Sequence, residues 1–231
     1  MTKKQKKRKN MKIKHWSDFN CPNSYIGIHR LKKAVDEVDV EVEWEMKPFE
    51  LYPTIFDTPT GSIITQNILQ YGQTPEIAEE KIIEIEKIAQ EDGLEMNYRD
   101  LQLTSSRKAH RLVKYIQNKY PECGMEAVFK IYEANFVENK IIADTDVLVE
   151  IADELGLDEK EISDFLEGDS YNFEVQIDEE DAIHMGIESI PLYFLNISEE
   201  QLIIPGAFEK EDFKIAIEDL INGKIESKSF I

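Results

Sequence analysis

The sequence has only two cysteines, Cys21 and Cys123, among its 231 residues. Two cysteines cannot build the set of disulfides that stabilises small secreted domains. The N-terminus also shows no apolar segment followed by a small-residue cleavage site, as a secretory signal would. We therefore expect a cytoplasmic protein whose cysteines stay reduced, with a core large enough to fold without disulfides.

Long apolar runs and excess positive charge are also missing. No run approaches the roughly 18 apolar residues that a membrane-spanning helix needs. The net charge is −20, because 47 acidic residues face 27 basic ones. A strongly acidic surface repels nucleic acid. We therefore expect neither a membrane segment nor a nucleic-acid-binding surface in the folded part of the chain.

The basic residues are concentrated at the N-terminus, where residues 1–10 carry six of them: Lys3, Lys4, Lys6, Lys7, Arg8 and Lys9. Such a run can bind nucleic acid or anionic lipid. A charge run of this kind is more often a solvated, disordered segment. We assign residues 1–10 to a disordered basic tail outside the fold.

The sequence also lacks the spacing patterns of metal and phosphate sites. The four histidines stand far apart, and no Cys/His cluster or paired-carboxylate motif accompanies them. No glycine-rich phosphate loop is present either. We therefore predict no metal site.

Cys21 is the residue that most clearly indicates chemistry. Residues 11–18 have a strand pattern, and Pro22 suits the first position of a helix that continues to about residue 38. At such a turn, unpaired N–H groups and the helix dipole favour a negative charge on the sulfur. We therefore expect a lowered thiol pKa and a nucleophilic Cys21. The alternative is a buried cysteine that serves only packing.

The order of the predicted elements indicates an α/β protein. The strand at 40–48 completes a strand–helix–strand unit, and a series of amphipathic helices follows. A helix at about 172–185, strands at 192–196 and 201–204, and a helix at about 210–222 end the chain. This order predicts a thioredoxin-like fold. Residues 11–60 and 170–231 would form the thioredoxin-like domain, and residues 61–169 an all-helical insertion domain.

Several short motifs occur in the order of a known family. They are residues 16–22 (WSDFNCP), 25–27 (YIG), 48–51 (PFEL), 109–112 (AHRL), 136–138 (FVE) and 189–191 (SIP). Together they resemble the DsbA-like thioredoxin-fold proteins of the FrnE type. The resemblance implies a cytoplasmic thiol–disulfide oxidoreductase whose helical domain overhangs the cysteine-bearing helix and shapes a substrate groove.

The chain departs from that family at Ser24. The family pattern is Cys-Pro-x-Cys, whereas this chain has Cys21-Pro22-Asn23-Ser24. A mixed disulfide on Cys21 could not be resolved by Ser24. We therefore expect monothiol chemistry on protein or small-thiol mixed disulfides, with a low-molecular-weight thiol such as glutathione as co-substrate and no tightly bound cofactor. Ser24 would donate a hydrogen bond to the Cys21 thiolate. Whether Cys123 acts as a resolving thiol stays open.

The resemblance also assigns a substrate-binding site. Pro191 matches the family's cis-proline, which would turn the backbone of Ile190 toward Cys21 to pair with an extended substrate. His110 matches a recurrent position on the insertion, and aromatic residues lie near the same end of the sheet. The catalytic candidates are Cys21 and Ser24, and the substrate-binding candidates are Pro191, Ile190, Phe19, Pro22, Asn23, Phe49 and His110.

Two other functions remain open. In the similar kappa-class glutathione transferases and 2-hydroxychromene-2-carboxylate isomerases, a serine replaces the leading cysteine and binds the sulfur of glutathione. A non-catalytic peptide-binding protein is the third possibility. The expected partners are protein or peptide disulfides and small thiols, with a monomer and a homodimer equally compatible with the sequence.

Overall fold

The computed structural model describes residues 9–59 and 61–224. Their centre is a four-stranded sheet in the order β2-β1-β3-β4. Strands β1 (Lys9–Ser17) and β2 (Val40–Pro48) are parallel, whereas β3 (Leu192–Ile197) and β4 (Glu200–Pro205) form an antiparallel hairpin beside β1. This confirms the predicted thioredoxin-like α/β fold.

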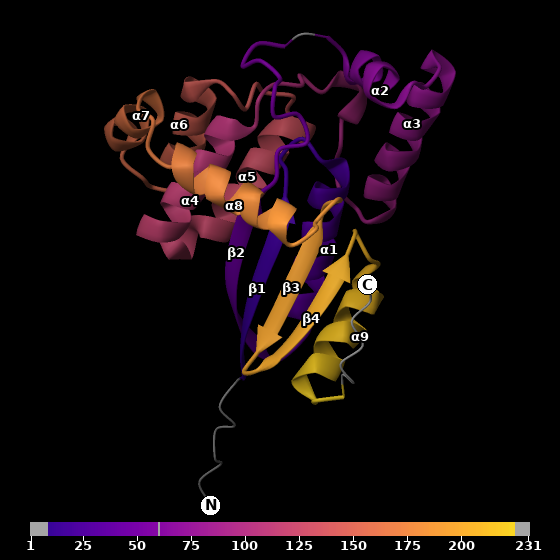
Figure 1. Ribbon diagram of the computed structural model, residues 1–231, viewed down its shortest axis with the longest axis vertical. Coiled ribbons are helices and arrows are strands. Elements are labelled where there is room, and N and C mark those ends of the chain that lie inside the picture. The colour runs from indigo at the N-terminus through magenta and orange to yellow at the C-terminus, as the bar shows by residue number, and fades with distance from the viewer. Residues whose placement is uncertain (1–8, 60, 225–231) are drawn as a thin grey trace, which may run out of the picture.

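Helices pack on the sheet and extend beyond its upper end (Figure 1). Helix α1 (Pro22–Asp36) packs against α9 (Lys210–Ile221) and connects the two parallel strands. Helices α4 (Arg107–Lys119), α5 (Gly124–Phe136) and α8 (Asn172–His184) all contact β2. The helices between β2 and β3 therefore lie over the end of the sheet where β1 leads into α1.

Four further helices complete the helical part. Helices α6 (Thr145–Glu154) and α7 (Glu159–Glu167) pack together beside α4. Helices α2 (Ile63–Tyr71) and α3 (Pro75–Glu91) pair on the opposite side of the molecule and contact the short 3-10 turn η1 (Tyr98–Asp100) (Figure 1). A second such turn, η2 (Pro121–Cys123), precedes α5.

Local sequence signals explain where these helices begin. The hydroxyls of Ser62 and Thr74 accept hydrogen bonds from the backbone N–H groups of the first turns of α2 and α3. The carboxylates of Asp144 and Asp158 do the same for α6 and α7. Pro75 occupies the first helical position of α3, where its missing N–H has no partner to lose.

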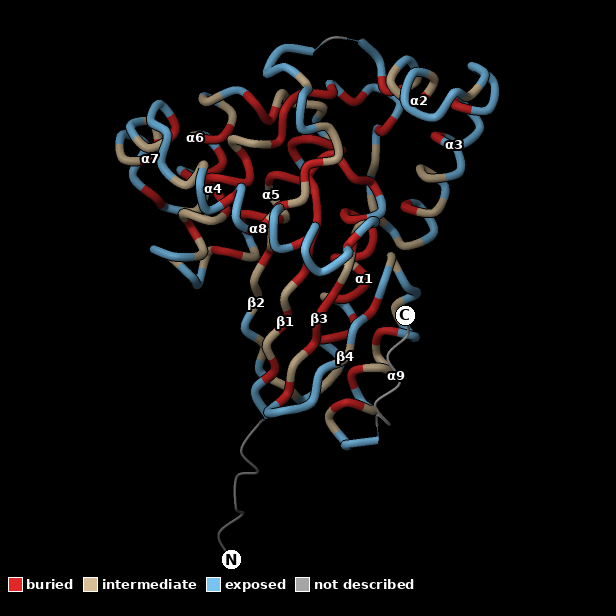
Figure 2. The backbone as a smooth tube through the Cα atoms, in the orientation of Figure 1, coloured by how far each residue is buried: buried red, intermediate tan, exposed pale blue. Residues whose placement is uncertain are grey.

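One hydrophobic core joins the sheet to the helical part (Figure 2). Met11 and Ile13 on β1 are fully buried, as are Tyr132 and Phe136 on α5. Because apolar side chains from both parts share the same core, the helical part and the sheet stabilise each other.

The element bounds agree with the sequence prediction except in two places. Strand β1 begins at Lys9, because Lys9 and Asn10 pair with Val40 and Glu41. Assigning these two residues to a disordered tail was therefore wrong, while residues 1–8 of that tail lie outside the described residues. Helix α2 was not predicted individually, since Leu69 and Tyr71 are exposed and the helix shows no clear apolar face.

Two features are absent from the described residues. In the ranges 9–59 and 61–224, no helix combines the length and the apolar character that crossing a bilayer requires. The same residues contain no group of three or more His, Cys, Asp or Glu side chains placed to hold a metal ion.

Candidate active site

Cys21 is the N-cap residue of α1, directly after the loop that leaves β1. Its carbonyl accepts hydrogen bonds from the N–H groups of Ser24 and Tyr25 at 3.0 and 3.2 Å, which form the first turn of the helix. Its own N–H donates to the carbonyl of Asp18 at 3.1 Å. These bonds fix the backbone of Cys21, and its side chain is 4% exposed.

The environment of the thiol differs from the sequence expectation. Burial raises the pKa of Cys21 to about 11, and the nearby carboxylate of Asp18 acts in the same direction. The Ser24 hydroxyl and the N–H groups of Ser24 and Asn23 lower this pKa, as expected at a helix start. The predicted net lowering was wrong because removing the sulfur from water outweighs the helix start.

Ser24 is fully buried one turn into α1. Its hydroxyl makes no hydrogen bond of ordinary length and angle to any described group, and it lies close enough to Cys21 to lower the thiol pKa. The hydrogen bond from Ser24 to the thiolate therefore stays a prediction.

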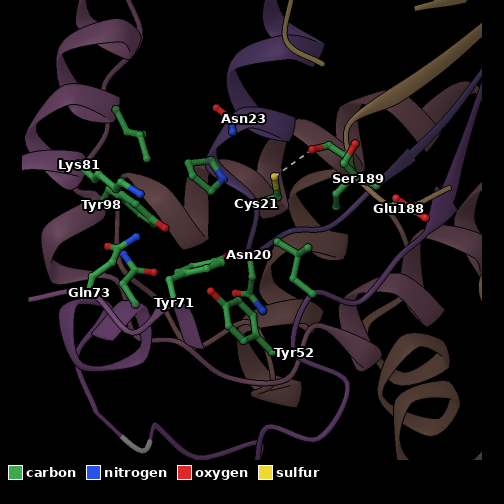
Figure 3. Close-up of a pocket in the computed structure, with 15 residues that line it drawn as sticks. Asn20, Cys21, Asn23, Tyr52, Tyr71, Gln73, Lys81, Tyr98, Glu188 and Ser189 are labelled. Atoms are coloured by element: carbon green, nitrogen blue, oxygen red, sulfur yellow. Dashed lines mark hydrogen bonds between the residues drawn. The ribbon is translucent and has the colours of Figure 1, made fainter. Parts of the chain in front are cut away.

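The peptide bond between Ile190 and Pro191 is cis, as predicted. The loop brings the carbonyl of Ile190 to 3.9 Å from Cys21 Sγ, where it accepts a long hydrogen bond from the thiol (Figure 3). The carbonyl of Pro191 accepts a hydrogen bond from the N–H of Gly206 at 2.8 Å, which anchors the loop to the end of β4. Residues 169 positions apart in the chain therefore meet at the sulfur.

Cys21 opens into a cavity of about 420 Å³. One wall consists of the start of α1 and the loop before Pro191, and the other comes from the segment after β2 and from α2, α3 and η1 (Figure 3). Three tyrosines, Tyr52, Tyr71 and Tyr98, stand on this second wall. The remaining lining residues are Asn20, Pro22, Asn23, Leu51, Asn67, Gln73, Lys81, Ile85, Glu188, Ser189 and Ile190.

The cavity separates the predicted substrate-binding residues into two groups. Pro22, Asn23 and Ile190 line it beside Cys21. The second wall was not predicted, because its residues are spread over a loop, two helices and a turn without a recurring spacing. The pairing of α2 with α3 brings them together, and no local sequence pattern reports that pairing.

Three predicted substrate-binding residues lie elsewhere. Phe19 is fully buried and packs against the rings of His110 and Tyr132, and His110 is 1% exposed. Phe49 is half-buried against the cluster that contains Trp16. Placing Phe19 and His110 in the groove was therefore wrong, because both are buried beneath the Cys21 loop. Phe49 does not line the cavity and packs in a cluster that also contains Ile190, so its contact with substrate stays a prediction.

The helical part holds the Cys21 loop through buried hydrogen bonds. The Oδ1 atom of Asp18 lies 3.1 Å from Nε2 of His110, and the other carboxylate oxygen accepts the N–H of Leu51 at 2.8 Å. Tyr132 donates its hydroxyl hydrogen to the carbonyl of Asp18 at 3.2 Å. Asn135 donates to the carbonyl of Phe19 at 2.8 Å. Helices α4 and α5 thus position the backbone just before the thiol.

A second buried acid, Glu50, lies near this network. Its carboxylate forms an ion pair with Arg107 at 2.7 Å. Burial raises the pKa of Glu50 to about 8, Arg107 opposes the increase, and the carboxylate of Glu179 adds to it. Glu50 can therefore gain or lose its proton near neutral pH.

Cys123 does not share the cavity with Cys21. It is the residue just before α5, and Asn135, which contacts the Cys21 loop, lies twelve residues further along the helix. At 1.5 Å per residue this separation is about 18 Å along the axis. A disulfide needs Cα atoms within about 7 Å of each other. Cys123 therefore cannot resolve a mixed disulfide on Cys21 in this fold.

Comparison with known proteins supports the interpretation of the fold. The chain is 28% identical over 209 residues to the uncharacterized protein YwbO of Bacillus subtilis, covering 90% of this chain and 96% of that protein. The crystal structure of the probable DsbA oxidoreductase SCO1869 from Streptomyces coelicolor has a TM-score of 0.81 and 27% identity, covering 96% of this chain and 94% of that one.

A second similar structure is the cytosolic disulfide reductase DsbM of Pseudomonas aeruginosa, solved with GSH. It has a TM-score of 0.66 and 17% identity, and the match covers 91% of this chain and 99% of that one. At this identity the likeness concerns the fold. The sequence profile of the DSBA-like thioredoxin domain matches residues 12–218, which is most of the chain. The protein therefore belongs to the DsbA-like thioredoxin-domain family.

Proposed function

We propose that the protein is a monothiol thiol–disulfide oxidoreductase that releases protein thiols from mixed disulfides with a small thiol. The observation that carries the proposal is the position of Cys21. Within the described chain it is the cysteine at the cavity, it faces the carbonyl of Ile190, and Ser24 stands where a resolving cysteine would be. Cys123, about 18 Å along α5 from Asn135, which anchors that loop, cannot replace it.

The proposed reaction has two exchange steps. The Cys21 thiolate attacks the small-thiol sulfur of a mixed disulfide, forms a disulfide with that sulfur, and releases the protein thiolate, which takes up the proton lost from Cys21. A second small-thiol thiolate then attacks the same sulfur and expels Cys21. The mixed disulfide is reduced to the protein thiol, and the small thiol that it carried leaves as a disulfide with the one incoming small thiol.

Burial of the thiol makes formation of the Cys21 thiolate the difficult step of this reaction. With a pKa of about 11, Cys21 is almost entirely protonated at neutral pH. A thiolate of high pKa is intrinsically more nucleophilic, which offsets part of its low abundance. The Ser24 hydroxyl and the first N–H groups of α1 stabilise the thiolate once it forms. The first step should therefore become faster as the pH rises toward 11.

The cavity is compatible with a small thiol as co-substrate. A volume of about 420 Å³ lies within the range typical of small-molecule sites. The similar reductase DsbM was solved with GSH, and we propose glutathione or a related low-molecular-weight thiol for this protein. Such a thiol must be kept reduced, and we therefore propose the cytoplasm as the compartment.

The test is to trap and resolve the intermediate. A peptide carrying a glutathione mixed disulfide would be mixed with the protein, and mass spectrometry would follow the glutathione adduct on Cys21 and its loss after adding glutathione. We expect Cys21→Ser to abolish both the adduct and the release of peptide thiol, and Cys123→Ser to leave both unchanged. Release of peptide thiol by Cys21→Ser at the wild-type rate would refute the proposal.

A glutathione-transferase-like or isomerase-like function is the second candidate. The raised pKa of Cys21 favours it, because a protonated thiol can donate a hydrogen bond to the sulfur of a bound thiol cofactor instead of attacking a disulfide. In this case a hydroxyl could replace the thiol. This candidate would be favoured if Cys21→Ser still conjugates an electrophile to glutathione and the wild type does not reduce mixed disulfides. Peptide binding without turnover in either assay would favour a non-catalytic binding protein.

A further inference from the structure

Lys81 differs from the other cations of this acidic protein. Among the Lys and Arg residues of the described chain, it alone has neither an ion pair nor a hydrogen bond. Every other one contacts a carboxylate or a carbonyl oxygen. With 47 acidic residues in the sequence, carboxylate partners are abundant. The lack of a partner for Lys81 therefore needs a local explanation.

The position of Lys81 on α3 provides this explanation. The residues four positions before and after it, Ile77 and Ile85, are uncharged, and Glu84, three positions further on, forms no ion pair with it. Lys87, six residues further along the same helix, pairs with Glu91 at the i,i+4 spacing. Lys81 instead faces the Cys21 cavity, which it lines together with Ile85 (Figure 3).

The cavity is polarised by its two charged lining residues. Lys81 stands on the wall formed by α2 and α3, and Glu188 stands on the opposite side, in the loop before Pro191, with Cys21 between them (Figure 3). An anionic group of a ligand that places its sulfur at Cys21 is therefore attracted to the Lys81 wall and repelled from the Glu188 side.

The Lys81 wall also contains a polar atom without a partner. The Oε1 atom of Gln73 is buried, lines the same cavity and accepts no hydrogen bond from any described group. An unsatisfied buried acceptor is costly unless a ligand or water supplies a donor. A ligand with an amide N–H or an ammonium group next to its carboxylate would satisfy both Gln73 and Lys81.

We propose that Lys81 selects a small thiol that carries a carboxylate, and that it binds this carboxylate while the ligand's sulfur lies at Cys21. The inference rests on the proposed function, since it identifies the small thiol that exchanges at Cys21. The ligand class is a peptide-like or amino-acid-like thiol, whose amide or ammonium N–H donates to Gln73. Lys81 acts as a specificity residue, and Cys21 still carries out the exchange.

The test compares two thiols and two lysines. Glutathione carries carboxylates, whereas cysteamine has a thiol and an ammonium group only. Formation of the adduct on Cys21 would be measured with one neutral peptide, carried as its mixed disulfide with each thiol, in the wild type, in Lys81→Gln and in Lys87→Gln. Lys87→Gln is the matched control, because it removes the same charge from the same helix outside the cavity.

We expect Lys81→Gln to raise the concentration of the glutathione mixed disulfide that half-saturates adduct formation by about tenfold to a hundredfold, the range of one charge-assisted hydrogen bond. The half-saturating concentration of the cysteamine mixed disulfide should stay within about twofold, and Lys87→Gln should resemble the wild type with both mixed disulfides. Equal losses with glutathione and cysteamine, or equal effects of Lys81→Gln and Lys87→Gln, would overturn the inference and leave the proposed function intact.

Two further arms separate the remaining outcomes. If Lys81→Gln weakens adduct formation only when the peptide is acidic, whichever small thiol it carries, the carboxylate belongs to the protein substrate and the small-thiol inference fails. If the wild type releases no thiol at all, the proposed function fails. In that case calorimetry with unreactive S-methylglutathione tests the role of Lys81 without any turnover. Weaker binding by Lys81→Gln but not by Lys87→Gln supports the inference, and equal binding by all three proteins refutes it.

Discussion

The Nε2 atom of His110 and the Oδ1 atom of Asp18 lie 3.1 Å apart, and neither side chain is exposed to solvent beyond 1%. His110 belongs to α4 in the helical part, whereas Asp18 lies three residues before Cys21. A buried acid next to a thiol affects that thiol in two ways. It holds the loop in place, and its negative charge opposes the thiolate.

The first prediction concerns Asp18→Asn. Asparagine keeps the shape of the side chain and removes the charge that helps to raise the pKa of Cys21. We expect this pKa to fall below about 11, with faster alkylation of the thiol between pH 7 and 9. Weakening the bond to His110 should cost roughly 1 to 3 kcal/mol of unfolding free energy. The pH profile of alkylation and urea unfolding measure the two effects. An unchanged or higher Cys21 pKa would show that the carboxylate does not oppose the thiolate.

The second prediction concerns the alkaline stability of the fold. Burial raises the pKa of Cys21 from 9.0 to about 11, so the unfolded chain loses this proton first as the pH rises. The stability from this group is complete below pH 9 and declines between pH 9 and 11, by roughly 3 kcal/mol in total. Unfolding of the wild type and of Cys21→Ser should be compared at pH 8 and pH 11. The wild type should lose more stability than the variant over this interval, and parallel losses would contradict the raised pKa.

The third prediction restores a second thiol with Ser24→Cys. Residue 24 is buried one turn after Cys21, beside its sulfur, so the new thiol can attack a mixed disulfide on Cys21 directly. We expect the glutathione adduct on Cys21 to become at least about tenfold shorter-lived without added thiol, following the effective concentration of a neighbouring group. Time-resolved mass spectrometry measures this lifetime. Ser24→Ala is the control and should leave the adduct as persistent as in the wild type.

The fourth prediction concerns Glu50. Its pKa is raised from 4.5 to about 8, mainly by burial, so the folded state keeps this proton longer than the unfolded chain. The stability from Glu50 is complete below pH 4.5 and is lost as the pH rises through 8. Glu50→Gln cannot ionise, so its stability relative to the wild type should increase between pH 5 and 9. Chemical denaturation across this range tests the trend, and a relative stability that falls over the same interval would refute it.

The sequence was informative where the chemistry is local. The bounds of β2, the start of α1 at Pro22 and the start of α3 at Pro75 follow from alternation and from proline at first helical positions. The position of Cys21 at the start of a helix was also predicted. The cis bond before Pro191 was predicted through the family resemblance. Each of these features depends on a few neighbouring residues, which a single sequence displays directly.

The sequence was least informative where burial and distant pairing decide. The pKa of Cys21 was predicted with the wrong sign, because the helix start is visible in the sequence and the burial of the sulfur is not. His110 and Phe19 were assigned to the groove, although they pack beneath the loop. The wall that carries Lys81 depends on the pairing of α2 with α3. Helical patterns predict individual helices but do not predict which helices pack against each other.

The Cys21 loop is completed only by residues that come much later in the chain. The carbonyls of Asp18 and Phe19 accept hydrogen bonds from Tyr132 and Asn135, which come 114 and 116 residues later. The carbonyl that accepts the hydrogen bond of the thiol belongs to Ile190. During synthesis on the ribosome, the thiol therefore leaves the exit tunnel long before the groups that bury it. A nascent chain has an accessible Cys21 with an ordinary pKa, open to capture by any small disulfide until α5 and β3 have been made.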